Sequence, residues 1–282
     1  GRRIEPAPVR VMAAERATVV SAVPAILLVL VQITYPLAHG VGRDRVTVVV
    51  VLLSAGAALV HAAVTRGVRW AAGLLVIVSG IGLGAEVLGT ATGFPFGCYE
   101  YASGRLGPEV MGVPLVVGAG VDGWVVSGED GGRDGESRCA GTDFAGGRGV
   151  GTAAGAVGWD LFLDPQMVAD GQWSWRSTVA GLPGLERIPV TNYVGWFGVA
   201  VAMAVLLEVW DRTAPDTGAG RAVPVAVFGW TWLGSALAHA AFLGLPVSAG
   251  YGFLGLGVLG FPLVRELGAR RITLRPRAHG TM

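Results

Sequence analysis

Three of the carboxylates that fall inside otherwise apolar stretches of the sequence are candidates for chemistry. Glu86 lies within the stretch 70–91, and Asp160 and Asp164 lie within the stretch 151–168. A spacing of four residues places two side chains on the same face of a continuous helix. Ionisable groups at membrane depth are costly and are by default candidates for a functional site. Two neighbouring carboxyl groups in a low-dielectric site do not both ionise readily, so the pair predicts a protonated acid beside an ionised base.

A structural role is the alternative for each aspartate. Asp164 precedes Pro165, and the residue before a proline is disfavoured in a helix. The sequence therefore also allows Asp164 to be the N-cap of a new helix whose first residue is Pro165. Asp160 could likewise be a purely structural polar residue.

Three aromatic and polar segments stand out from the apolar background. They are 94–101 (FPFGCYEY), 159–168 (WDLFLDPQMV) followed by 171–175 (GQWSW), and 188–196 (IPVTNYVGW). All three lie at predicted membrane boundaries. Trp and Tyr favour the membrane–water interface whatever the function, so an aromatic belt is the alternative to a binding site.

The residue inventory argues against several classes of protein. The four histidines do not form a cluster of the kind that a membrane di-iron enzyme needs. Cys98 and Cys139 form neither a disulfide framework nor a zinc motif. No GxGxxG motif stands between a predicted strand and a helix, and there is no P-loop. We therefore expect no metal and no cofactor. A net charge of +1 argues against nucleic acid as a partner. His61 and His239 lie in apolar stretches and are expected to pack through hydrogen bonds.

The composition is that of an integral membrane protein. Of 282 residues, 52% are apolar and only 15% are charged, whereas soluble domains carry about 25% charged residues. Seven stretches approach the roughly 20 apolar residues that a spanning helix needs. These stretches are 17–38, 46–64, 70–91, 151–168, 193–210, 222–242 and 247–264, and an eighth is suspected at 108–126. We expect an all-α polytopic helix bundle of seven to eight spans, forming one membrane domain over residues 1–282.

The arginines favour eight spans. With eight spans and a cytoplasmic N-terminus, 16 of the 21 Arg lie on the cytoplasmic side, whereas without the eighth span only eight do. The positive-inside rule thus predicts a multi-pass protein of the cell membrane with cytoplasmic N- and C-termini. Residues 118–151 are anomalous, because they hold twelve Gly and nine charged residues but no Leu, Ile, Met or Pro. This segment is either a natural Gly-rich loop or a stretch out of register with its ancestral coding, and the arginine count favours the second.

The strings WDLFLDPQMV with the following GQWSW, FGCYEY and PVTNYVGW resemble the membrane carotenoid hydratases of the CruF type, such as the bisanhydrobacterioruberin hydratases. The resemblance extends from about the first span to the last and departs from the family at 118–151, where a hydrophobic helix would be expected. It implies an enzyme of carotenoid biosynthesis that adds water to the terminal C1=C2 double bond of an acyclic carotenoid. The implied product is a tertiary 1-hydroxy carotenoid. The implied partners are this substrate, the bilayer and other enzymes of the pathway.

The candidate residues suit that reaction, which needs a proton donor and then stabilisation of a tertiary cation. We expect Asp160 and Asp164 to be the acid and base, with Glu86 as the alternative acid. The candidates for contact with the substrate, several of them aromatic faces that favour a cation, are Tyr99, Tyr101, Trp159, Trp173, Asn192 and Trp196. A transporter and an inactive scaffold remain alternatives. A transporter would favour paired broken helices, and only one Pro-broken span with carboxylates is found.

Overall fold

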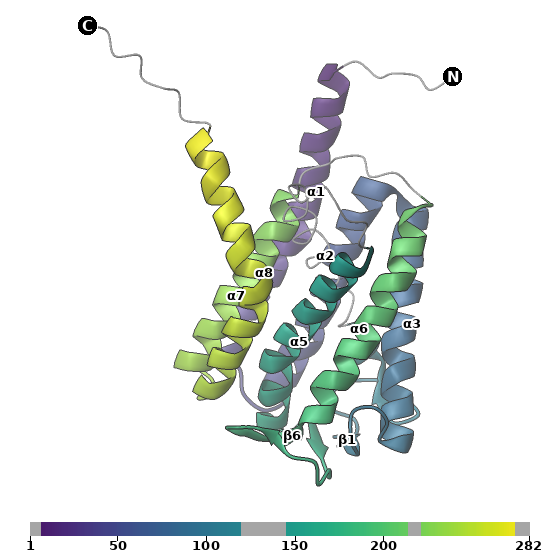
Figure 1. Cartoon of the computed structure of the whole chain (residues 1–282), viewed down its shortest axis with the longest axis vertical. Coiled ribbons are helices and arrows are strands. Elements are labelled where there is room, and N and C mark those ends of the chain that lie inside the picture. Colours follow the sequence, from purple (N-terminus) through teal and green to yellow (C-terminus); the bar gives the residue numbers. More distant parts are fainter. Residues whose placement is uncertain (1–6, 120–144, 214–220, 274–282) are drawn as a thin grey trace, which may run out of the picture.

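The computed structural model describes residues 7–119, 145–213 and 221–273. These residues form a bundle of long helices that run roughly alongside one another (Figure 1). The helices are α1 (Ala7–Thr34), α2 (Val41–Arg66), α3 (Val68–Thr92), α5 (Ala145–Ala169), α6 (Val190–Asp211), α7 (Ala222–Ala241) and α8 (Pro246–Thr273), with the short 3-10 turn η1 (Tyr35–Leu37) after α1. All seven strongly apolar stretches expected from the sequence are therefore helical.

Several of these helices have the length and apolar character needed to cross a membrane. Among the described residues, five do so: Glu15–Leu37, Val41–Arg66, Val68–Thr92, Val190–Asp211 and Pro246–Ala269. Their outward faces carry large apolar side chains that no other part of the described chain covers, including Ile26, Val76, Val194 and Leu254. These features indicate a membrane protein. Helices α5 and α7 are not among the five, and α5 is the helix that carries Asp160 and Asp164.

The helices form a closed ring in which the neighbours in space are not always neighbours in sequence. Around the ring, α1 packs on α2, α2 on α3, α3 on α6, α6 on α5, α5 on α8, α8 on α7 and α7 on α1. Helices α3 and α5 both run toward the end of the bundle that is lowest in Figure 1.

The suspected span at 108–126 is wrong in its first part. Residues Glu109–Val110 (β2) and Val113–Pro114 (β3) form a tight hairpin instead. Met111 and Gly112 both have positive φ, 52° and 79°, and this turn geometry is incompatible with a continuous helix. A helical segment begins only at Leu115 and is described to Ala119. It packs closely on α3, because a Cβ at Gly118 would lie 3.3 Å from the Leu83 Cβ.

Most of the anomalous segment 118–151 lies outside the described residues. Its last part, however, is helical, because α5 begins at Ala145. The expected start of this span at Gly151 is therefore wrong by about two turns. Further along α5, small residues let this helix approach α8 closely. The backbones of α5 and α8 touch where a Cβ at Gly158 would lie 2.7 Å from the Gly255 carbonyl carbon.

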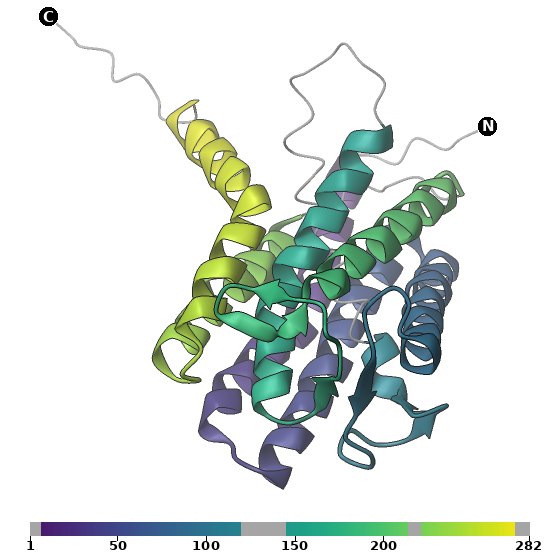
Figure 2. The ribbon, with the colours of Figure 1, turned by 60° about the horizontal axis from the view of Figure 1, so that its bottom comes forward.

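Three small sheets accompany the helices of the bundle. Three two-stranded antiparallel sheets, well seen in Figure 2, lie at the lower end of the bundle. They pair β1 (Tyr99–Tyr101) with β4 (Trp173–Trp175), β2 with β3, and β5 (Gly181–Leu182) with β6 (Leu185–Pro189). The strings YEY and WSW alternate aromatic and polar residues, which is the two-residue period of a strand. The first two aromatic segments are thus joined in one sheet.

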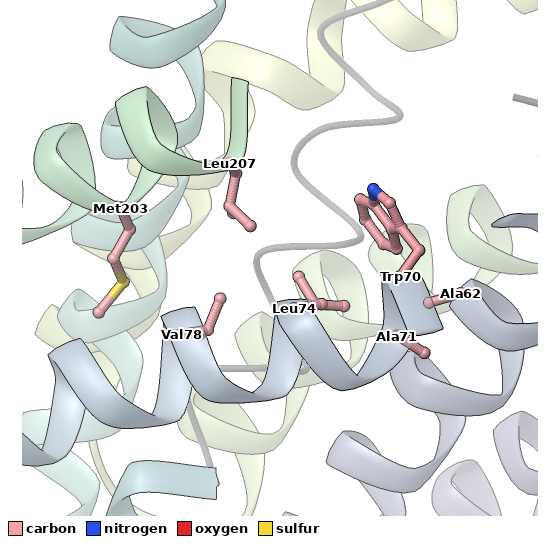
Figure 3. Close-up of a cluster of buried hydrophobic side chains, with 7 residues drawn as sticks. All are labelled: Ala62, Trp70, Ala71, Leu74, Val78, Met203 and Leu207. Carbon is pink, nitrogen blue, oxygen red and sulfur yellow. The ribbon is translucent and has the colours of Figure 1, made fainter. Parts of the chain in front are cut away.

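The upper half of the bundle is fixed by an apolar cluster between α3 and α6. Figure 3 shows Leu74 and Val78 on successive turns of α3, facing Met203 and Leu207 of α6. All four side chains are fully buried. This cluster secures α3, so that Glu86, about two turns beyond Val78, has a defined position in the lower half.

Candidate active site

A cavity of about 150 Å³ lies inside the ring of helices, and we call it the central cavity. Every long helix described above contributes to its wall, together with Leu106, Val116, Val117 and Trp173. Most lining side chains are apolar. The exceptions include three carboxylates, Glu86, Asp160 and Asp164. The structure therefore brings together, in one apolar cavity, the three acids that the sequence singled out from two distant helices.

Asp160 and Asp164 face the central cavity because α5 is continuous. The helix runs through Pro165 to Ala169, so residues 160 and 164 lie on one face, one turn apart. Both side chains are buried, with exposed fractions of 8% and 4%. The alternative in which Asp164 caps a new helix is wrong, because no new helix begins at Pro165.

The two aspartates differ in their hydrogen bonds. The Asn192 side chain, in the first turn of α6, donates from Nδ2 to Asp164 Oδ2 at 2.5 Å. By contrast, Asp160 Oδ2 is buried and meets no hydrogen-bond partner among the described residues. A buried polar atom without a partner is unusual and calls for an explanation. Asp164 is therefore held as an acceptor, while Asp160 presents an oxygen that is free to meet a ligand.

Glu86 is held by two tyrosines. The hydroxyl groups of Tyr99 and Tyr101 both donate to Glu86 Oε2, that of Tyr101 at 2.8 Å. Burial, together with the nearby charge of Glu86, raises the pKa of both phenols above their usual value of about 10. The two tyrosines thus stay protonated donors. They do not line the central cavity but stand behind Glu86.

Aromatic packing orients the tryptophans. Tyr101 and Trp173 meet edge to face at 5.5 Å between ring centroids, across the β1–β4 sheet. Phe96 stacks on Trp196 with ring centroids 4.9 Å apart. Phe96 fits between α3 and α6 only because both helices have glycine there: a Cβ at Gly89 or Gly195 would lie within 2.7 Å of its ring. Of the predicted substrate contacts, Trp159, Trp173 and Trp196 line the cavity, whereas Asn192 and the two tyrosines support its carboxylates.

Residues 46–259 match the model of a family described as carotenoid biosynthesis protein. The chain belongs to this family. The matched region contains all three carboxylates and all three aromatic segments. No curated protein and no solved structure matches the chain. The family membership supports a role in carotenoid biosynthesis, in agreement with the coarser part of the resemblance, and does not specify the reaction.

A network of charged and polar side chains lies at the lower end of the bundle. The sequence alone did not predict it. The Arg105 guanidinium donates to both carboxylate oxygens of Asp44, at 3.1 and 2.7 Å. Gln172 donates to the same carboxylate at 2.6 Å. Arg43 pairs with Asp170 at 2.6 Å. The network ties the start of α2 to the loop after β1 and to the turn that leads from α5 into β4, so it fixes the strand that carries Trp173.

The three carboxylates converge on the cavity rather than on a single point. Within the described parts of the chain, no group of three or more His, Cys, Asp or Glu side chains could hold a metal ion. The chemistry that the described side chains offer is that of acids, bases and aromatic faces. His61 and His239 make hydrogen bonds to neighbouring helices, His61 to the Ser21 hydroxyl and His239 to the Phe162 carbonyl.

Proposed function

We propose that this carotenoid biosynthesis protein adds water to the terminal C1=C2 double bond of an acyclic carotenoid, giving a tertiary 1-hydroxy end group. One observation carries the proposal. An unpartnered carboxyl oxygen of Asp160 lies one helical turn from a second carboxylate, Asp164, on the wall of an otherwise apolar cavity. An apolar end group fits such a cavity, and hydration of an alkene needs one group that gives a proton and another that takes one.

In the proposed first step, Asp160 is the general acid. Its carboxyl proton forms a new C–H bond at C2, and the electrons of the C1=C2 π bond supply that bond. A positive charge remains at C1, which is a tertiary carbon. Trp159, Trp173 and Trp196 line the same cavity, and the faces of indole rings stabilise cations.

In the second step, water attacks the cation at C1 and loses a proton to Asp164. The hydrogen bond from Asn192 orients this carboxylate as the acceptor. Transfer of that proton from Asp164 to Asp160 restores the starting state, so the net change is the addition of one water molecule. Glu86 suits the role of acid less well, because its Oε2 already accepts two phenolic hydrogen bonds. It is better placed to stabilise the positive charge. The steps described require no metal and no organic cofactor.

The placement in the membrane is part of the proposal. Substrate and product both partition into the bilayer, and the apolar outer faces of the helices match that environment. We propose a multi-pass protein of the cell membrane with both termini in the cytoplasm, because this orientation puts 16 of 21 Arg inside. Other enzymes of the carotenoid pathway that share the bilayer would be its functional neighbours.

The decisive test is pigment analysis in a host that makes lycopene, with and without the protein. We expect the parent protein to produce more polar 1-hydroxylated pigments, and Asp160→Asn to abolish them while the protein stays folded in the membrane. Glu208→Gln is the matched control, because Glu208 is a carboxylate of a spanning helix that does not line the cavity. Hydroxylated pigment formed by Asp160→Asn at the parental rate would refute the role of Asp160. Unchanged pigments with the folded parent would refute hydration.

A further inference from the structure

Pro165 removes one backbone hydrogen bond of α5. The carbonyl that loses its donor lies between Asp160 and Asp164 in the sequence. Proline has no N–H, so the carbonyl of the residue four positions earlier, Leu161, loses its helical donor. Nevertheless α5 continues for another turn to Ala169. A buried carbonyl without a donor is costly, so a donor must come from elsewhere.

A side chain from another helix supplies this donor, and a second side chain contacts the next carbonyl along α5. Ser248, in the first turn of α8, donates its hydroxyl to the Leu161 carbonyl at 2.7 Å. His239, near the end of α7, has Nε2 at 3.1 Å from the Phe162 carbonyl. Its Nδ1 lies 2.8 Å from the Ser235 carbonyl of its own helix. Carbonyl oxygens only accept and a neutral imidazole has one N–H, so His239 donates to Phe162 in the tautomer that carries its proton on Nε2. Both side chains are almost fully buried, each with an exposed fraction of 1%.

Packing reinforces these two bonds. The Phe162 ring lies against the imidazole of His239, with ring centroids 5.0 Å apart. On its other side the ring presses on α8 at Gly252, where a Cβ would lie 2.6 Å from it. The segment 161–162 is therefore held by α7 and α8 from the side that faces away from Asp160 and Asp164.

We infer that Ser248 and His239 are positioning residues that hold the α5 backbone at 161–162 and thereby fix how Asp160 and Asp164 face the central cavity. We call the pair the α5 clamp. Asp160 precedes the clamped carbonyls directly, and Asp164 follows them by two residues. A helix that is bent by a proline and not held would let the two carboxyl groups change their separation, and small misplacements of reacting groups lower rates strongly. This inference rests on the proposed hydration for its kinetic consequence.

Pro165→Ala provides a sharp test, because alanine restores the missing N–H and gives the Leu161 carbonyl its own helical donor. In the purified full-length protein with lycopene as substrate, Ser248→Ala should lower kcat about tenfold and change KM less than twofold. In the Pro165→Ala background the same substitution should lower kcat less than twofold. Ser248→Thr, which keeps the hydroxyl, should retain most of the parental kcat. Equal losses of kcat in both backgrounds would overturn the assignment.

His239 is tested by a matched pair of substitutions. His239→Leu removes the donor to Phe162, whereas His239→Gln keeps an N–H donor in a side chain of similar reach. We expect the Leu variant to lose at least tenfold more kcat than the Gln variant, at similar KM. Equal kcat in the two variants would contradict the hydrogen-bonding role.

Thermal melting in detergent separates failure of the clamp from failure of the proposed reaction. Ser248→Ala should lower the melting temperature in the parent background but not in the Pro165→Ala background. If the folded parent shows no hydration while this melting pattern is seen, the clamp holds and the proposed reaction is wrong. If Ser248→Ala lowers the melting temperature equally in both backgrounds, the clamp is wrong whatever the activity.

Discussion

The hydrogen bond from Asn192 to Asp164 allows the most direct test of Asp164 as the proposed base. Asn192→Leu replaces the amide by an apolar group of similar size and leaves Asp164 Oδ2 without this donor. Both side chains are buried, so water does not readily take the place of the amide. We expect the variant to hydrate the substrate more slowly, with the loss in kcat rather than in KM, because Asn192 does not line the central cavity.

The size of the effect follows from the kind of bond. A hydrogen bond to a charged group contributes about 1.5–3 kcal/mol. The Asn192 amide donates to a carboxylate oxygen, and charge-assisted hydrogen bonds are the strong ones. Since each 1.4 kcal/mol corresponds to about a tenfold change in rate, kcat should fall about 10- to 150-fold. The assay is the initial rate of 1-hydroxy carotenoid formation from lycopene by the purified protein, with chromatographic detection.

The neighbouring residue provides the control. Thr191 precedes Asn192 on α6, and its hydroxyl oxygen is buried and meets no partner in the part of the chain that the structure describes. Thr191→Val keeps the shape and removes that hydroxyl, so it should leave kcat within about twofold of the parent and should not lower stability. A folded Asn192→Leu protein with parental kcat would refute the assignment of Asp164 as the base that Asn192 orients.

Three further predictions concern stability and topology. Because burial raises the pKa of Tyr99 and Tyr101, they stay protonated in the fold while the unfolded chain ionises them above about pH 10. The free energy of unfolding should therefore fall above about pH 10 by about 1.4 kcal/mol per pH unit for each tyrosine. In thermal melts, Phe at either position should reduce this loss of stability. An alkaline slope that is unchanged in the Phe variants would contradict the prediction. A reporter fused after Met282 should be active only in the cytoplasm, and activity on the opposite side would reverse the proposed orientation. Replacing residues 120–144 by an apolar helix that ends in an Arg-bearing loop should raise the melting temperature in detergent, and equal melting temperatures would show that the native segment is tolerated.

Much of the candidate site could be predicted because its physical signals are local. Glu86, Asp160 and Asp164 stand out as charges in apolar stretches, and charges are costly at that depth whatever the fold. The spacing of four between the aspartates needs only a continuous helix to place them on one face. The long apolar stretches likewise become helices, since a helix satisfies its own backbone hydrogen bonds without help from other segments.

The parts that were missed depend on partners far away in the sequence. The alternation in YEY and WSW is visible, yet three residues are too few to predict a strand, and β1 forms because β4, more than 70 residues later, supplies its hydrogen bonds. The role of Tyr99 and Tyr101 as donors to Glu86 follows from that pairing. The sequence could place them only near the membrane boundary.

Pro165 shows what a sequence can and cannot specify at a broken helix. The sequence predicts that the Leu161 carbonyl lacks its helical donor. Two structures are consistent with that prediction: a new helix capped by Asp164, and a continuous helix in which another segment supplies the donor. The choice between them depends on whether a donor for this carbonyl is available from elsewhere, and Ser248, which supplies it, lies more than 80 residues later in the sequence. The α5 clamp makes the continuous helix possible, and the continuous helix puts both aspartates on the cavity wall. The residues that most decide whether this site can work are therefore two that do not reach into it.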